Sequence, residues 1–222
     1  MDNVTLCLTI GKRPDELAQT LDSLLSKIAF KHIIAINDFG DEATNEVFRQ
    51  KCPNGQLISL GYNLGHHKAI DYMYQQVTTD YIFHCEDDWF FDSTPDIAAA
   101  ITTLDSQPQV TAIGFRKYDD FLYTAEERNA VKPLDGELAA YVRVDHLHDQ
   151  WYGYSFNPHL AKKSVWQNHT PFAQFKKERH ISRHLRQKGL YMLFLKHGNC
   201  HHIGHESVAN PPKTFWQKLK FW

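Results

Sequence analysis

Residues 81–89 read YIFHCEDDW, an apolar run that passes directly into three consecutive carboxylates, Glu86, Asp87 and Asp88. The apolar part is typical of a buried strand. Three acids at the end of such a strand raise one another's pKa unless a cation binds among them. A hard divalent ion prefers carboxylate oxygens and would act as a Lewis acid on a bound phosphate. The stretch therefore indicates a metal site at a sheet edge, or, taken alone, an ordinary solvated acidic turn.

Strands and helices alternate upstream of this stretch. The β-branched run 4–10 predicts a strand, and apolar residues at helical spacing after Pro14 predict a helix. The cycle continues with expected strands at 32–37 and 57–59 and expected helices at 42–50 and 65–77. Such alternation predicts an α/β fold with a mainly parallel sheet flanked by helices. Ligands of these sheets bind at the carboxyl ends of the strands, where the acidic triplet lies.

The second half of the chain is less regular. We expect strands near 111–115, 139–145 and 190–195, and helices at about 158–167 and 174–188. A length of 222 residues suits one α/β domain and is too short for two comfortable ones. We therefore expect a single domain.

Composition narrows the class of protein. With 42% hydrophobic residues and a formal charge of -2, the chain is globular and lacks the basic balance of a general nucleic-acid binder. Its four cysteines show no CxxC spacing, which predicts free thiols in a reducing compartment. No stretch has the pattern of a signal peptide or a membrane span. We expect a cytoplasmic protein, or one peripheral on the cytoplasmic face of the membrane.

The order of the motifs resembles the family 2 inverting glycosyltransferases, which have the GT-A fold. The matching stretches are strand 4–10 followed by Arg13-Pro14, the run 33–38 ending in Asp38, the turn Asn63-Leu64-Gly65, and Glu86-Asp87-Asp88 in the place of the family's DxD motif. The resemblance covers residues 4–92 well and 174–205 more loosely. Two stretches depart from the family pattern, Thr9-Ile10-Gly11-Lys12 and Phe39-Gly40-Asp41, and leave the base of the donor open.

The resemblance implies a nucleotide-sugar donor, UDP- or GDP-linked, and a divalent cofactor, Mn²⁺ or Mg²⁺. It assigns the metal to Asp88, with His202 completing the site and His205 close behind. Asp38 would hold the base or ribose. The further donor-binding residues that we expect are Thr9, Arg13, Asn63, Lys68, Glu86 and Asp87. Lys68 belongs to this set because it lies with two histidines at an expected helix start, where amide groups and positive side chains can contact phosphate or simply face solvent.

An inverting transfer needs a base that removes the proton of the acceptor hydroxyl. Glu178 matches the acidic position of the family's late motif, although an acid there can also simply favour a helix N-terminus. Asp145 and Asp149 are the rival bases. The aromatic residues that follow them are expected to stack on an acceptor sugar; they are Trp151, Tyr152 and Tyr154.

These expectations divide the chain into a GT-A-like domain over 1–210, with a donor half at about 1–115 and an acceptor half at about 116–210, and a basic aromatic tail at 211–222. The tail has three lysines, four aromatics and no acid, which favours weak contact with a membrane surface or, alternatively, packing against the domain's own core.

The resulting hypothesis is a metal-dependent glycosyltransferase acting on a saccharide or lipid-linked acceptor, with inversion. Two alternatives stay open. One is a metal-dependent nucleotidyl or phosphoryl transferase, against which the lack of a Gly-rich phosphate loop counts. The other is a non-catalytic carbohydrate-binding module with a degenerate site.

Overall fold

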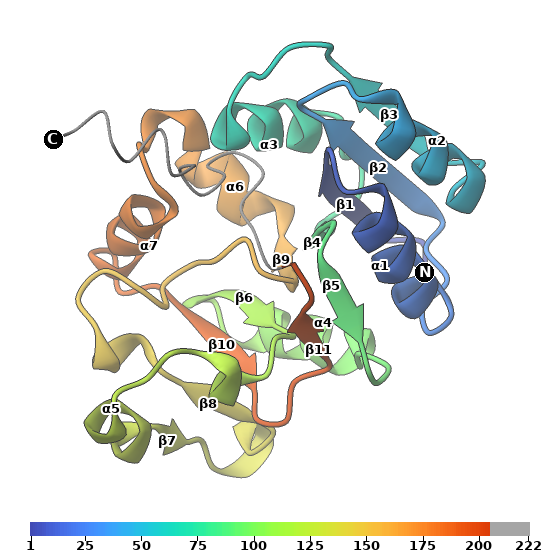
Figure 1. Ribbon diagram of the computed structural model, residues 1–222. Helices are drawn as coiled ribbons and strands as arrows, with labels where there is room; N and C mark the ends of the chain where they lie inside the picture. Colours follow the sequence, from blue (N-terminus) through green and yellow to red (C-terminus); the bar gives the residue numbers. More distant parts are fainter. Residues whose placement is uncertain (205–222) are drawn as a thin grey trace, which may run out of the picture.

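A computed structural model describes residues 1–204 (Figure 1). His205 and the tail 211–222 lie outside these residues. The centre of the described part is a nine-stranded sheet with the order β3-β2-β1-β4-β9-β6-β10-β8-β7. Pairing is parallel through β3, β2, β1 and β4 and between β6 and β10, whereas β8 and β9 run in the opposite direction. The mixed, mostly parallel α/β sheet confirms the predicted fold class.

The first half follows the predicted alternation closely. Its elements are β1 (Val4–Ile10), α1 (Pro14–Leu25), β2 (His32–Asn37), α2 (Glu42–Lys51), β3 (Gln56–Ser59), α3 (His66–Gln75) and β4 (Tyr81–Glu86). In the ladder, Thr9 of β1 pairs with Glu86 of β4, and Ile10 pairs with Asn37 of β2. The carboxyl ends of these three strands therefore lie side by side, which brings the loops that follow them to one edge of the sheet.

Helices cover both faces of the sheet. Alternate residues of β1 point to opposite faces, so Leu6 and Leu8 pack with α1 and α2 while Cys7 packs with α3. A strand that is buried on both faces is expected to be mostly apolar, and five of the seven residues of β1 are, while buried Thr5 is bonded to the hydroxyl of Thr79. Helices α6 and α7 share the face of α3. The fold is thus a three-layer arrangement with the sheet in the middle.

The second half contains shorter elements. They are β5 (Trp89–Phe91), α4 (Ile97–Ser106), β6 (Val110–Gly114), α5 (Ala125–Ala130), β7 (Lys132–Pro133), β8 (Tyr141–Arg143), β9 (His159–Lys162), α6 (Lys163–His169), α7 (Glu178–Arg186), β10 (Tyr191–Leu195) and β11 (Cys200–His202), with four 3₁₀ turns between them. Strands β5 and β11 form a separate antiparallel pair in which Trp89 faces His202. This pair returns the end of the described chain to the acidic triplet.

The predicted helix over 158–167 was wrong in its first half. Residues His159–Lys162 form strand β9, which is inserted antiparallel between β4 and β6. Leu160 and Ala161 are both buried because neighbouring strand residues pack on opposite faces of the sheet. The helix begins only at Lys163. Helix α4 was not anticipated from the sequence.

All four cysteines are free, as the lack of CxxC spacing predicted, and all four are buried. Over residues 1–204, no helix is both long and apolar enough to cross a membrane.

Candidate active site

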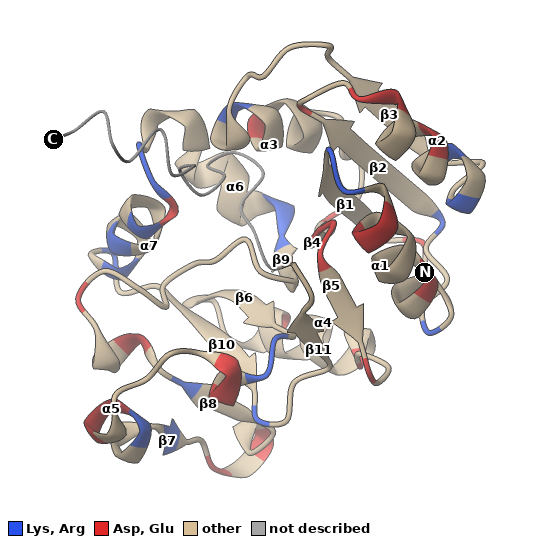
Figure 2. Cartoon of the chain, viewed as in Figure 1, with Lys and Arg blue, Asp and Glu red and all other residues tan. Residues whose placement is uncertain are grey.

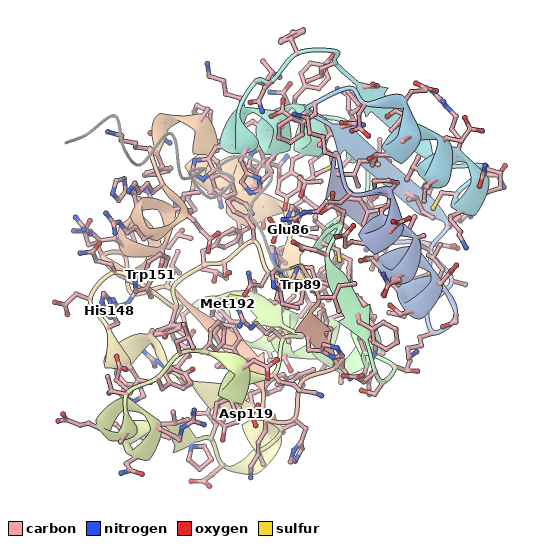
Figure 3. All side chains as sticks on the ribbon, viewed as in Figure 1. Glu86, Trp89, Asp119, His148, Trp151 and Met192 are labelled. Carbon is pink, nitrogen blue, oxygen red and sulfur yellow. The ribbon has the colours of Figure 1, made fainter. Side chains whose placement is uncertain are left out.

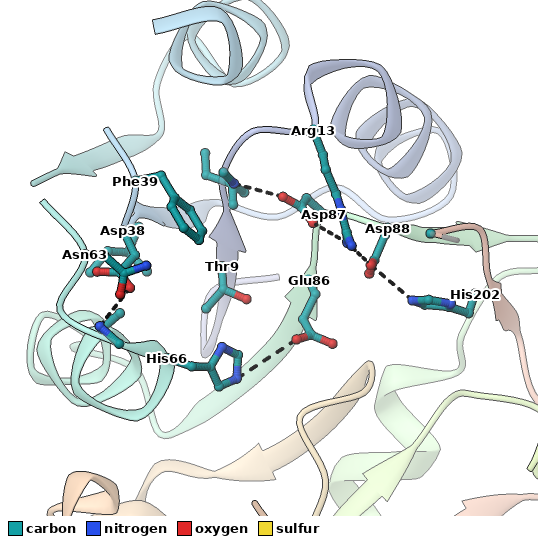
Figure 4. A pocket seen from close by; sticks show the side chains of 16 residues that line it. Thr9, Arg13, Asp38, Phe39, Asn63, His66, Glu86, Asp87, Asp88 and His202 are labelled. Atoms are coloured by element: carbon teal, nitrogen blue, oxygen red, sulfur yellow. Dashed lines mark hydrogen bonds and ion pairs between the residues drawn. The ribbon is translucent and has the colours of Figure 1, made fainter. Parts of the chain in front are cut away.

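A cavity of about 470 Å³ opens at the carboxyl ends of β1, β2 and β4 (Figure 4). That size lies within the range of small-molecule sites. Its walls come from the loops after these strands, the start of α3 and the end of β11. The lining residues are Thr9, Ile10, Gly11, Arg13, Ile36, Asp38, Phe39, Asn63, Gly65, His66, Ala69, Glu86, Asp87, Asp88, His202 and Gly204.

Asp87 is held by the loop after β1. Its Oδ2 accepts a hydrogen bond of 2.8 Å from the backbone N–H of Gly11, and its Oδ1 lies 3.5 Å from the guanidinium of Arg13. The hydroxyl of Thr20, on α1, donates to the backbone carbonyl of Asp87 at 2.9 Å. These contacts fix Asp87 as part of the cavity wall.

Asp88 lies where three segments meet. Its Oδ2 is contacted by Arg13 and, at 3.0 Å, by Nε2 of His202. Its backbone carbonyl accepts the N–H of Ile203 at 2.9 Å. A side chain at position 204 would place its Cβ 2.5 Å from Oδ2 of Asp88, so only glycine permits this close approach. Oδ1 of Asp88 is buried and has no hydrogen-bond partner within residues 1–204.

This arrangement partly fits a divalent metal. A buried carboxylate oxygen without a donor and an imidazole at 3.0 Å from the same carboxylate are suitable ligands. Within the described chain no three His, Cys, Asp or Glu side chains converge closely enough to hold an ion by themselves. Any metal bound here would therefore need further ligands, such as phosphate oxygens or water, which is usual for Mg²⁺ at phosphate sites.

The three acids differ in protonation. Burial raises the pKa of Glu86 well above its usual value, and the charges of Asp88, Glu178 and Asp87 add to the rise. Burial and the charge of Asp88 likewise raise the pKa of Asp87 to about 7. Burial alone would raise the pKa of Asp88 too, but His202 and Arg13 together lower it. Asp88 is thus the acid that stays ionised most readily.

Asp38 forms the opposite wall and carries the loop before α3. Its two carboxylate oxygens accept the backbone N–H groups of Leu64 at 2.6 Å and Gly65 at 3.0 Å. Gly65 has φ +88°, a left-handed conformation that favours glycine. Asp38 therefore positions the turn at Asn63, and each of its oxygens can still accept another hydrogen bond.

The two histidines and the lysine at the start of α3 have different surroundings. His66 lines the cavity, with Nε2 4.0 Å from Oε1 of Glu86. Burial, and then His67, lowers the pKa of His66 to about 4, so its ring is neutral at pH 7. His67 turns to the carbonyl of Phe175 at 2.7 Å. Lys68 is exposed and does not line the cavity, so its predicted contact with the donor gains no support.

Of the three predicted bases, Glu178 is the one near the triplet. It is the first residue of α7, and its charge is among those that raise the pKa of Glu86. Burial raises the pKa of Glu178 itself, and contacts with the Ser155 side chain and the Phe156 backbone offset part of the rise. It does not line the cavity. It therefore lies near the cavity but not in its wall.

The rival bases lie elsewhere. Asp145 is buried and forms a two-bond ion pair with Arg143, at 2.6 and 3.1 Å. Asp149 is exposed. Neither lines the cavity.

The predicted acceptor aromatics do not form one cluster. Tyr154 is 2% exposed and its hydroxyl interacts with Nε2 of His159 at 3.1 Å, so its ring has no face free for a sugar. Tyr152 packs against Phe121. Trp151 is 37% exposed beside α7 (Figure 3). Only Trp151 of the three keeps substantial exposure, and burial in the core excludes Tyr154 from the predicted stacking.

The model of the glycosyl transferase family 2 matches residues 6–183, most of the chain. The chain belongs to glycosyl transferase family 2. No curated protein matches it by sequence.

Solved structures of other glycosyltransferases share this family 2 chain's fold. The mannosyltransferase PcManGT from Pyrobaculum calidifontis, solved with GDP-Man and Mn²⁺, has a TM-score of 0.59 at 14% identity over 86% of this chain and 53% of its own. GalNAc-T7, solved with UDP, GalNAc and Mn²⁺, has a TM-score of 0.65 at 13% identity over 96% and 45%. S. aureus TarS 1–349 has a TM-score of 0.59 at 13% identity, over 91% of this chain and 60% of its own. The chain thus spans about half the length of these proteins and carries a glycosyltransferase domain with the GT-A fold.

Several cavity residues of this family 2 domain were not anticipated from the sequence. Gly11 holds Asp87 through its backbone, and Gly204 permits the approach to Asp88. Phe39 lines the cavity next to Asp38, with Nζ of Lys12 4.6 Å from its ring centroid. The signal for Phe39 was present, because the stretch 39–41 was recognised as a departure from the family pattern.

The raised pKa of Asp87 makes stability depend on pH. Between its usual value of 3.8 and about 7, the folded state retains a proton that the unfolded chain has lost, so the free energy of unfolding falls as the pH rises through this range. The full shift corresponds to at most about 4 kcal/mol. Asp87→Asn keeps an acceptor for Gly11 and should raise the Tm in chelator at pH 7 by at least about 5 °C, but not at pH 4.

Differential scanning calorimetry of the metal-free protein checks this expectation. Asp92→Asn is the matched control, because the pKa of Asp92 is lowered. Burial alone would raise this pKa, but the larger combined effect of His201 and Lys117 lowers it. Removing that charge should lower the Tm slightly. If the Tm of Asp87→Asn at pH 7 were equal to or below that of the wild type, ionised Asp87 would not destabilise the folded protein, and the expectation would be wrong.

Proposed function

We propose that this chain transfers a sugar from a nucleoside-diphosphate donor, bound in the cavity above β1, β2 and β4, to an acceptor hydroxyl deprotonated by Glu178. One observation carries the proposal: Asp88, buried and with Oδ1 lacking a partner in residues 1–204, lies in the wall opposite Asp38, beside His202. A cavity with nucleotide-sized volume and an acid at each end suits a donor that has a base at one end and a diphosphate at the other. Family membership supports the reaction class.

The donor's nucleoside is assigned to the wall that contains Asp38, Phe39 and Asn63. Asp38 keeps acceptor capacity for a base or ribose hydroxyl, and the Phe39 ring offers a face for stacking. Thr9 lies between this wall and the triplet (Figure 4). The donor is GDP- or UDP-linked in this proposal, as in the complexes of PcManGT and GalNAc-T7.

The diphosphate is assigned to the triplet. Arg13, which contacts both Asp87 and Asp88, supplies positive charge there. Asp88 and His202 would hold Mn²⁺ or Mg²⁺, which would supply Lewis-acid stabilisation of the departing nucleoside diphosphate. Glu86 and Asp87, whose raised pKa values favour protonated or hydrogen-bonded forms, are assigned to the sugar and ribose hydroxyls.

Glu178 is assigned as the base, with inversion at the anomeric carbon. Its pKa is raised toward neutral pH, which suits a general base. The acceptor would approach from the side of α7 and Trp151. In this proposal the acceptor is a saccharide or a lipid-linked saccharide.

Nucleotide binding offers the first test. At 100 times its Kd, GDP or UDP with Mn²⁺ should stabilise the fold by about 2.7 kcal/mol, which raises the Tm by roughly 5–10 °C. Thermal-shift curves with nucleotide plus Mn²⁺, Mn²⁺ alone, and nucleotide plus chelator separate the contributions. A carbohydrate-binding module would show no nucleotide-dependent shift.

Asp38→Asn should reduce that nucleotide shift by more than half, because it removes the charge and one of the two N–H acceptors that hold Leu64 and Gly65. Asp80→Asn is the control, since Asp80 precedes β4 at the opposite edge of the sheet and bonds Asn3. An unchanged shift in Asp38→Asn would remove the nucleoside from this wall.

A further inference from the structure

Charge is strongly segregated along the chain. Residues 176–222 contain ten lysines and arginines and two acids, a formal charge of +8. Residues 1–175 contain 14 lysines and arginines and 24 acids, a formal charge of -10. The near-neutral total therefore conceals a cationic C-terminal segment, and the proposed transfer reaction does not use its positive charge.

The described part of this charge is concentrated on α7 and on the residues directly before and after it. Figure 2 shows the helix at the periphery of the molecule with basic residues along it. Its buried side consists of Ile181, Ser182 and Leu185, so the other side faces outward. We call the basic residues on α7 and directly beside it the cationic face; it comprises the exposed Lys176, Lys177, Arg183 and Lys188 and the half-buried Arg179 and Arg186.

No ion pair within residues 1–204 compensates the positive charge of the cationic face. Within residues 1–204, none of the six side chains lies within 4.0 Å of a carboxylate. Glu178, the one acid in this stretch, contacts Ser155 and Phe156 instead. The pKa of His180 is lowered by burial and then by Arg179, Arg183, Lys177 and Lys176. The cations thus repel further positive charge and favour an anionic partner.

An exposed aromatic flanks the same helix. Arg186 donates a hydrogen bond to the carbonyl of His148, and the ring of His148 lies 6.4 Å from that of Trp151. Trp151 is 37% exposed (Figure 3). Tryptophan is enriched at the headgroup level of membranes, and basic residues next to it bind anionic lipids. The sequence beyond the described residues adds the same combination, three lysines and four aromatics within 211–222.

We propose that the cationic face of α7, together with Trp151, docks this protein onto the surface of an anionic phospholipid membrane. A spread of cations on and beside α7, none paired with a carboxylate of residues 1–204, matches a plane of headgroups, whereas a site for one soluble phosphate needs donors that converge on a point. Because α7 begins at Glu178, docking would present the proposed base to an acceptor at the membrane surface; that last step rests on the proposed function, whereas docking itself does not.

Vesicle co-sedimentation of the full chain without donor or metal tests docking directly. The protein should bind vesicles that contain phosphatidylglycerol and not vesicles of phosphatidylcholine alone, and raised salt should release it. The combined variant Lys176→Gln, Lys177→Gln, Arg183→Gln, Lys188→Gln changes four exposed residues and should lower the partition coefficient at least about tenfold.

The matched control neutralises four exposed cations elsewhere: Lys31→Gln, Arg49→Gln, Lys51→Gln and Lys132→Gln. It has the same net charge as the α7 variant and should bind like the wild type. Equal loss in both variants, or equal binding to neutral vesicles, would overturn the proposal. Binding of inorganic polyphosphate through α7 with no binding to anionic vesicles would overturn the lipid assignment in favour of a soluble polyanion. Because no transfer is measured, failure here leaves the proposed reaction standing.

Discussion

Asp88→Asn should reduce metal-dependent sugar transfer at least about 1000-fold while the protein stays folded. Asn has nearly the same shape as Asp but cannot supply an anionic oxygen to a cation. In the wild type, Oδ2 of Asp88 is engaged by Arg13 and His202, and the buried Oδ1 has no partner within residues 1–204. Oδ1 is therefore the oxygen that a metal would bind. Losing its charge would remove the proposed stabilisation of the leaving diphosphate.

The assay is transfer or donor hydrolysis over a panel of nucleotide sugars, with Mn²⁺ titrated from chelator to saturation. Circular dichroism and the Tm report the fold, and a modest fall in Tm is expected because the pKa of Asp88 is lowered in the folded state despite its burial. Asp92→Asn is the control, since Asp92 pairs with Lys117 and His201 outside the cavity. Full activity of Asp88→Asn, or of the wild type in saturating chelator, would refute the role of Asp88.

The first half of the fold was predictable because β1, β2 and β4 are largely buried on both faces. Such strands read as mostly apolar runs, and 4–10, 32–37 and 81–85 are of this kind. Strand β9 was missed for a physical reason. It has only four residues, and its mixed sequence His-Leu-Ala-Lys continues into α6, so no local pattern separates strand from helix. Its place in the sheet is decided by pairing with β4 and β6, which are distant in sequence.

Proximity of Asp38 to the triplet could be predicted, because parallel strands place their carboxyl ends at one edge. Proximity of His202 to Asp88 could not be derived from spacing, since they are 114 residues apart and meet through the β5–β11 pair. Only the resemblance to a family suggested it. The burial of individual residues in the aromatic stretch 151–154 could not be predicted either, because nothing local indicates that Tyr154 is buried while Trp151 is exposed.

Glu178→Gln should lower kcat for transfer by at least about 100-fold with little change in donor affinity. The side chain lies beside the triplet without lining the donor cavity, so a neutral isostere leaves the nucleotide contacts in place. It removes the group that we propose takes the acceptor proton. The mutation also relieves charge repulsion on Glu86, so the Tm in chelator should be equal or slightly higher.

Three variants distinguish Glu178 from its rivals in one assay. Asp149→Asn changes an exposed residue outside the cavity and should keep the wild-type kcat. Asp145→Asn breaks the pair with Arg143 and should lower the Tm, with activity retained at temperatures where it remains folded. Donor hydrolysis by water gives a further comparison. Loss of a base that acts on the acceptor should lower the rate of sugar transfer more than it lowers nucleotide binding. If Asp149→Asn or Asp145→Asn lost transfer while Glu178→Gln kept it, the base would have to be assigned to the loop that precedes Trp151, and the acceptor would approach across that loop instead of along α7.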